Sequence, residues 1–130
     1  MIKNIPNKYT VKLLKKELDK NFKDKFDFLY LPHSKEQDCN LGYGFINFSD
    51  SLHILLFKEI YEGKKWKSFN SSKLCALGYA RFQGNDLINH LQNSYAFINS
   101  DQDKRPFISE IKDKIVKIDV PAVSLDYIKY

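Results

Sequence analysis

Residues 41–48 constrain this chain most, because they read Leu-Gly-Tyr-Gly-Phe-Ile-Asn-Phe and alternate as an extended strand does. Tyr43, Phe45 and Asn47 fall on one side of such a strand. The other side carries a glycine, an isoleucine and a phenylalanine, which suit a core. Two interpretations follow for the rings of Tyr43 and Phe45. Either both faces of the strand are buried, or the two rings form a platform on which flat ligands stack.

The composition is typical of a soluble globular protein, and the positive net charge slightly favours an anionic partner. Its 130 residues are enough for one domain and a short extension. The net charge is +5, which favours a nucleic acid only weakly. No apolar run approaches the roughly 20 residues of a membrane helix, and the start lacks a signal peptide. Because only two cysteines are present, Cys39 and Cys75, we expect no disulfide and an intracellular location, in the nucleus, the cytoplasm or both.

Hydrophobic periodicity predicts the order strand, helix, strand, strand, helix, strand. The predicted strands are residues 1–5, 26–31, 41–48 and 74–82, and the predicted helices run from Thr10 to about Asn21 and from Ser49 or Asp50 to about Glu62. This order predicts an α+β, ferredoxin-like βαββαβ fold with a four-stranded antiparallel sheet, two helices on one face and an open second face. The apolar stripe of the second helix is too wide for one face, so we expect something besides the sheet to cover it.

The chain continues beyond the predicted fourth strand. We divide it into a core at residues 1–84, a helical extension packed on that core at 85–108, and a tail of uncertain structure at 109–130. Asp86 can cap a third helix with apolar residues on one side. That side can pack on the open sheet face or on the second helix, and we favour the second helix. The tail can be helical or extended.

Residues 41–48 match the principal signature of the RNA-recognition motif at every position except the first, where Leu41 replaces a basic residue. The resemblance implies that Tyr43 and Phe45 contact the sugar and the base of a bound nucleotide. Residues 1–5 fit the last five positions of the second signature of that motif. Met1 stands where an aromatic residue is usual, so the predicted platform has two rings where many relatives have three.

A narrower resemblance covers about residues 1–107. The chain resembles the C-terminal RNA-recognition motif of the Mei-two-like class of meiosis regulators, in which a methionine on the first strand and a non-basic residue before the glycine are usual. The motifs that carry the resemblance lie at 4–10, 26–32, 40–48, 63–66, 69–71, 79–84, 90–94 and 105–106. The resemblance implies RNA binding in the control of meiosis or development, and a longer protein of which this motif is a part.

The predicted RNA-binding residues lie on the platform and around it. Lys3 shares the Met1 side of the first strand, and Lys8 follows that strand, where it can meet phosphate. Asn47 can donate and accept hydrogen bonds, which suits a base edge. Arg81 and Gln83 lie where the fourth strand leaves the sheet. The full set is Met1, Lys3, Lys8, Tyr43, Phe45, Asn47, Arg81 and Gln83.

We expect no catalysis, no cofactor and no metal. The sequence has neither a Walker-type phosphate loop nor a nucleophile elbow, and its histidines lack metal-ligand spacing. Trp66 and Phe69, in the connector before the fourth strand, are expected to be core residues and not ligand sites. The alternative to single-stranded RNA as partner is a protein-interaction or dimerisation module that uses the second helix and the extension.

Overall fold

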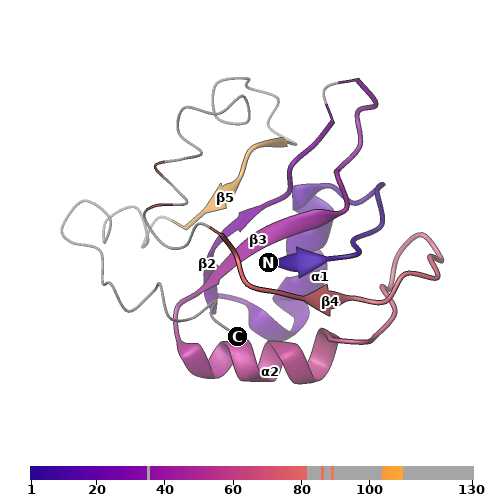
Figure 1. Cartoon of the computed structure of the whole chain (residues 1–130). Helices are drawn as coiled ribbons and strands as arrows, with labels where there is room; N and C mark the ends of the chain where they lie inside the picture. The colour runs from indigo at the N-terminus through magenta and orange to yellow at the C-terminus, as the bar shows by residue number, and fades with distance from the viewer. Residues whose placement is uncertain (35, 82–85, 87–88, 90–103, 110–130) are drawn as a thin grey trace.

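The computed structural model describes residues 1–34, 36–81, 86, 89 and 104–109 (Figure 1). Its elements in chain order are β1 (Ile2–Lys3), α1 (Val11–Phe22), β2 (Phe26–Tyr30), β3 (Tyr43–Phe48), α2 (Ser51–Tyr61), β4 (Ala76–Leu77) and β5 (Phe107–Ile108). The strands form one sheet in the order β4-β1-β3-β2-β5, and all pairs are antiparallel. The predicted α+β fold is therefore confirmed, with a fifth strand added at the β2 edge.

Both helices begin at the residues that the sequence indicates. Thr10 caps α1, since its hydroxyl accepts a hydrogen bond from the Leu13 backbone NH at 3.1 Å. Asp50 caps α2 in the same way through the Leu52 NH at 2.9 Å. The two helices pack on one face of the sheet, and α1 lies behind the strands in Figure 1. The apolar residues that recur at helical spacing along α1 therefore face the core, as predicted.

The core is built largely from aromatic rings. Phe22 of α1 lies 5.2 Å from Phe57 of α2 and 5.8 Å from Phe48 of β3, measured between ring centroids. Phe57 also stacks on Tyr61, at 4.6 Å. All four rings are buried. Because β3 contributes Phe48 and Ile46 to this core, the opposite side chains of β3 must lie on the other face of the sheet.

A β-bulge in β2 decides which of its aromatic residues enter the core. Phe26 pairs with Phe48, but Phe28 pairs with Asn47, so Asp27 is an extra residue on β2. Without the bulge Phe26 and Phe28 would share a face. With it, Phe26 joins the core and Phe28 lies on the opposite face, beside Asn47.

The edge strands differ from the prediction. β1 and β4 are only two residues each, although residues 1–5 and 74–82 were expected to be extended. Asn4 has a φ of 61°, in the left-handed region, which ends β1 before Pro6 is reached. The strand β5 was not predicted. It pairs with β2 through Phe28 opposite Ile108 and Leu29 opposite Phe107, and so it covers an edge that the four-stranded fold would leave open.

One expectation about burial is wrong, and another is not tested. Leu52, Leu55, Leu56 and Ile60 of α2 are exposed, so no described part of the chain covers the wide apolar stripe of this helix. That the third helix covers it stays a prediction, because most of that helix lies outside the described residues. Trp66 is buried as expected, but Phe69 is 47% exposed.

Some predictions fall on residues outside those described. These are Gln83, most of the third helix at 86–98, and all of the tail except Ser109. The division into core, extension and tail therefore stays a prediction. Within the described ranges no helix is long and apolar enough to cross a membrane.

Candidate nucleic-acid interface

The sheet face opposite the helices carries the residues singled out in the third strand. Lys3 of β1 pairs with Tyr43 of β3 on one side and with Ala76 of β4 on the other, so these three side chains share this face. Phe45 lies two residues after Tyr43 on the same face. Lys3 is exposed, and Tyr43 and Phe45 are half-buried. The structure thus brings one cation and two rings together on an accessible part of the sheet.

A third ring belongs to this face, contributed by β2. Tyr30 pairs with Phe45, and their rings are nearly parallel, with 6.4 Å between centroids and an interplanar angle of 17°. Tyr43 meets Phe45 edge-on at 5.8 Å and 86°. Tyr30 is 7% exposed, so its ring supports Phe45 from the side and is not open to a ligand, and sequence reasoning missed this supporting role. The antiparallel register of the second and third strands was the signal that would have found it.

Burial raises the pKa of Tyr30 to about 12, with a smaller contribution from Tyr43. The Tyr30 hydroxyl keeps its proton at physiological pH, as an unperturbed tyrosine also does, and burial extends this to more alkaline conditions. It remains neutral beside the platform, so it adds no negative charge that would repel a phosphate.

The β2 side of the same face is closed. Phe28 is 1% exposed and Asn47 is 4% exposed. Asn47 Nδ2 donates to Asp27 Oδ1 at 2.9 Å, and its buried Oδ1 has no hydrogen-bond partner among the described residues. The prediction that Asn47 contacts a base stays a prediction, and in this conformation Asn47 is not on the accessible part of the face. The accessible platform is the β1–β3 half of the sheet.

Asn40, in the loop just before β3, fixes the start of that strand. Its Nδ2 donates to the carbonyl oxygens of Pro6 and Tyr9, both at 2.9 Å, and its Oδ1 accepts from the Gly42 NH at 2.7 Å. Gly42 has a φ of 90°, which favours glycine. The buried Asn40 therefore joins the loop before β3 to the turn after β1 and sets the direction in which β3 leaves.

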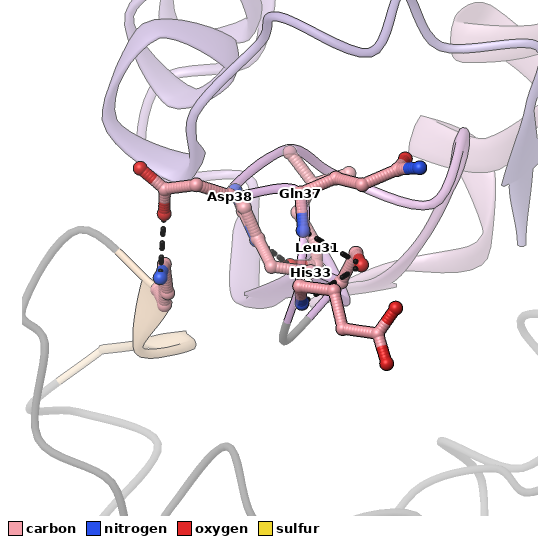
Figure 2. A network of polar contacts seen from close by, with 7 residues as sticks. Leu31, His33, Gln37 and Asp38 are labelled. Atoms are coloured by element: carbon pink, nitrogen blue, oxygen red, sulfur yellow. Dashed lines mark hydrogen bonds and ion pairs between the residues drawn. The ribbon is translucent and has the colours of Figure 1, made fainter.

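The loop between β2 and β3 is organised by short-range contacts, shown in Figure 2. His33 Nδ1 lies 2.7 Å from the Leu31 carbonyl oxygen, and the Ser34 hydroxyl accepts from the Gln37 backbone NH at 3.2 Å. Lys104 Nζ contacts Asp38 Oδ1 at 2.6 Å, which ties this loop to the segment before β5. The hydrogen bond and charge of Lys104 hold the pKa of Asp38 below its usual range.

The remaining predicted residues surround the platform. Lys8 is exposed in the turn after β1, and Arg81 is exposed in the segment after β4. Met1 is half-buried and continues the β1–β4 ladder, since its amino group donates to the Gly78 carbonyl oxygen at 3.0 Å. The side chain of Lys3 lies over Gly78, where an added Cβ would be 2.6 Å from its Cε.

Rings and cations on a sheet face can bind flat, anionic ligands, since rings stack on bases and lysines neutralise phosphates. No cluster of three or more potential metal ligands occurs among the residues the structure describes. A β4-β1-β3-β2 sheet backed by two helices, with paired rings on β3, defines the RNA-recognition-motif class of proteins.

Comparison with known sequences agrees with this class. The chain belongs to the family described as RNA recognition motif 2, whose model matches residues 1–93. It is 50% identical over 109 residues to "Protein MEI2-like 4" of Oryza sativa subsp. japonica, a match covering 83% of this chain and 11% of that protein. It is 49% identical over 109 residues to "Protein MEI2-like 1" of Arabidopsis thaliana, covering 83% of this chain and 12% of that protein.

A third relative, "Protein MEI2-like 3" of Arabidopsis thaliana, is 44% identical over 121 residues, which are 90% of this chain and 16% of that protein. The resemblance to Mei-two-like proteins is therefore confirmed, and the family supports an RNA-binding role. The chain spans well under a fifth of the length of each of these relatives.

Proposed function

We propose that this domain binds single-stranded RNA on the β1–β3 half of its sheet, with Tyr43 and Phe45 stacking on successive bases. The observation that carries the proposal is the geometry of these two rings, which are half-buried and accessible on a face opposite the core. Lys3 supplies a cation between β3 and β4, where a phosphate of the same strand passes. Met1, Lys8, Arg81 and Gln83 add contacts around the platform, and no catalytic step is involved.

Alanine substitution at the platform tests the proposal. Each stacked base contributes about 1–3 kcal/mol, so Tyr43→Ala and Phe45→Ala should each weaken binding of a random single-stranded RNA pool roughly 5- to 150-fold. Leu55→Ala is the matched control, because Leu55 is an exposed apolar residue of α2 on the other side of the molecule. Circular dichroism confirms that each variant is folded. Wild-type affinity in both platform variants would refute the proposal.

The biological role we propose is post-transcriptional regulation in meiosis or development, in the nucleus or the cytoplasm. It is supported by the names of the MEI2-like relatives alone. A strain or tissue that expresses Phe45→Ala in place of the wild-type protein should show a meiotic or developmental defect. A normal phenotype with abolished RNA binding would contradict this role.

A second candidate function, protein interaction or dimerisation through α2, is favoured by the exposure of Leu52, Leu55, Leu56 and Ile60. The two functions are compatible, because α2 and the platform lie on different sides of the sheet. Light scattering tests the homodimer: a monomer at high protein concentration would eliminate it. An RNA-inactive domain that still captures a protein partner would leave only this candidate.

A further inference from the structure

The positive charge of this chain is concentrated in two short segments. Residues 1–10 and 63–74 together contain six lysines and neither aspartate nor glutamate. The six are Lys3, Lys8, Lys64, Lys65, Lys67 and Lys73. The whole chain has 21 Lys and Arg against 16 Asp and Glu, so the other residues carry 15 cations and 16 anions. The entire net charge of +5 therefore originates in these two segments.

The structure packs the two segments against each other at one end of the sheet. Trp66 Nε1 donates to the Asn4 carbonyl oxygen at 2.8 Å, and Asn4 Nδ2 donates to the Leu74 carbonyl oxygen at 3.1 Å. Lys73 Nζ donates to Asn7 Oδ1 at 3.0 Å. In Figure 1 the turn after β1 and the loop before β4 both lie at the right of the sheet. The two segments that carry the six lysines therefore lie side by side, and we call these six lysines together the lysine surface.

An exposed ring lies within this lysine surface. Phe69 packs edge-on against Tyr9, with 5.3 Å between centroids and an interplanar angle of 76°. Tyr9 is itself buried, and its hydroxyl accepts from the Ser68 backbone NH at 3.1 Å. Phe69 is 47% exposed and has a φ of 66°, which is unfavourable for a phenylalanine. A ring that is strained, anchored at one edge and exposed elsewhere is preorganised to stack on a ligand.

We infer that RNA bound on the platform continues past Lys3 onto the lysine surface, where Phe69 stacks a further base and the lysines neutralise phosphates. The β1 strand joins the two sites, since Lys3 pairs with Tyr43 on β3 and the next residue, Asn4, accepts a hydrogen bond from Trp66 of the second lysine-bearing segment. This inference rests on the proposed function, because it extends the same RNA strand. Lysines around an exposed ring suit a nucleotide, which offers a phosphate and a flat base together.

RNA length provides the test. Binding of random-sequence RNA of about 4 and about 12 nucleotides is measured for the wild type, Phe69→Gly, Phe69→Tyr and Tyr43→Ala. Glycine relieves the positive φ and removes the ring, whereas tyrosine keeps the ring. We expect Phe69→Gly to weaken binding of the longer RNA at least roughly fivefold and to change the shorter RNA less than about twofold. Phe69→Tyr should retain wild-type affinity for both.

A second measurement does not disturb the packing of Phe69. The double variant Lys64→Gln/Lys67→Gln should reduce the slope of log affinity against log salt for the longer RNA by about 1.4, since each phosphate contact to single strands contributes about 0.7. The matched control is Lys12→Gln/Lys16→Gln, which removes the same charge from the exposed side of α1 and should leave the slope unchanged. All four substituted lysines are exposed.

The outcomes separate the two claims. If Tyr43→Ala weakens both RNAs while Phe69→Gly and Lys64→Gln/Lys67→Gln match the wild type on the longer one, the inference fails and the platform stands. If Tyr43→Ala changes neither RNA, the proposed function fails and this inference fails with it. If the lysine variants lose binding to an acidic peptide but not to the longer RNA, the surface serves a protein, and the inference is overturned.

Discussion

At the scale of single residues, the position of β3 depends most on the side chain of Asn40. It is 1% exposed, and its amide makes three hydrogen bonds to backbone groups of the β1–α1 turn and of Gly42. The Asn40 backbone NH also donates to the Asn7 carbonyl oxygen, at 3.1 Å. Both polar atoms of this side chain are therefore used, and a carboxylate could replace the acceptor Oδ1 but not the donor Nδ2.

We predict that Asn40→Asp lowers the free energy of unfolding by about 3 kcal/mol or more. The substitution replaces two donors with a carboxylate oxygen facing two carbonyl oxygens in a buried site. Urea unfolding followed by circular dichroism measures the effect. Gln37→Glu is the control, because it makes the same chemical change at an exposed position of the same loop and should cost less than about 0.5 kcal/mol. Equal stabilities for the two variants would contradict this role of Asn40.

Other residues follow from the sequence to different degrees. Thr10 and Asp50 were identifiable as caps because capping depends on neighbours within three residues. Tyr43 and Phe45 were identifiable because side chains alternate between the two faces along a single strand. Tyr30 was not identified, since its place beside Phe45 depends on pairing between strands. The exposure of Phe69 was not predictable either, because a large apolar residue in a connector is usually buried.

At the scale of elements, β5 is the part of the fold that the sequence did not predict. It is only two residues long, and it exists because it pairs with β2, about 80 residues earlier in the chain. Local periodicity cannot detect such a strand. Local periodicity cannot detect the bulge at Asp27 either, since the bulge is defined by the register of β2 against β3. Both features bear on the site, because they place Phe28 and Ile108 beside each other on the face that carries the platform.

We predict that packing, and not the Asp38–Lys104 ion pair, holds β5 on the sheet. The Phe107 ring lies 5.7 Å from that of Phe26, and Lys15 Nζ lies 4.6 Å from the Phe107 centroid. Phe107→Ala should therefore lower the free energy of unfolding by about 1–3 kcal/mol. Asp38→Asn should leave it unchanged within error, because the Asp38 side chain is 81% exposed. Urea unfolding of both variants checks this. The reverse order of effects would show that the ion pair dominates.

At the scale of the whole molecule, three buried side chains that can lose a proton make the folded state less stable at alkaline pH. Burial raises the pKa of Cys75 from 9.0 to about 12 and that of Tyr30 from 10.0 to about 12. Burial, together with the hydrogen bond to Glu17, raises the pKa of Tyr9 to about 12. The unfolded chain loses these protons at lower pH than the folded one. Their stabilising contribution is therefore complete below about pH 9 and is lost as the pH rises toward 12.

We predict that the thermal midpoint falls above about pH 9 and that Cys75→Ala moves the onset of this fall to about pH 10, where the tyrosines begin to contribute. Cys39→Ala is the control, since Cys39 is a free, half-exposed thiol and should leave the onset in place. Thermal melts at pH 7 to 11 measure both variants. An unchanged onset in Cys75→Ala would contradict the assigned origin of the effect.

The fold of the whole molecule also shows where the net positive charge of the chain is located. A net charge of +5 is a weak indicator when only the total is known. The fold makes it informative, because it brings together the two segments that carry six lysines, next to the strand that pairs with Tyr43. The order of elements and the platform were thus predictable from the sequence, whereas the lysine surface needed the contacts of Asn4 with Trp66 and Leu74.

The central claim is that RNA lies on the β1–β3 half of the sheet. Ultraviolet crosslinking of the wild-type domain to single-stranded RNA, followed by mass spectrometry of the adducts, tests it directly. Crosslinked nucleotides at Tyr43 and Phe45 are the result we predict, because stacked rings lie in direct contact with bases. Adducts confined to α2, with neither Tyr43 nor Phe45 modified, would contradict the account.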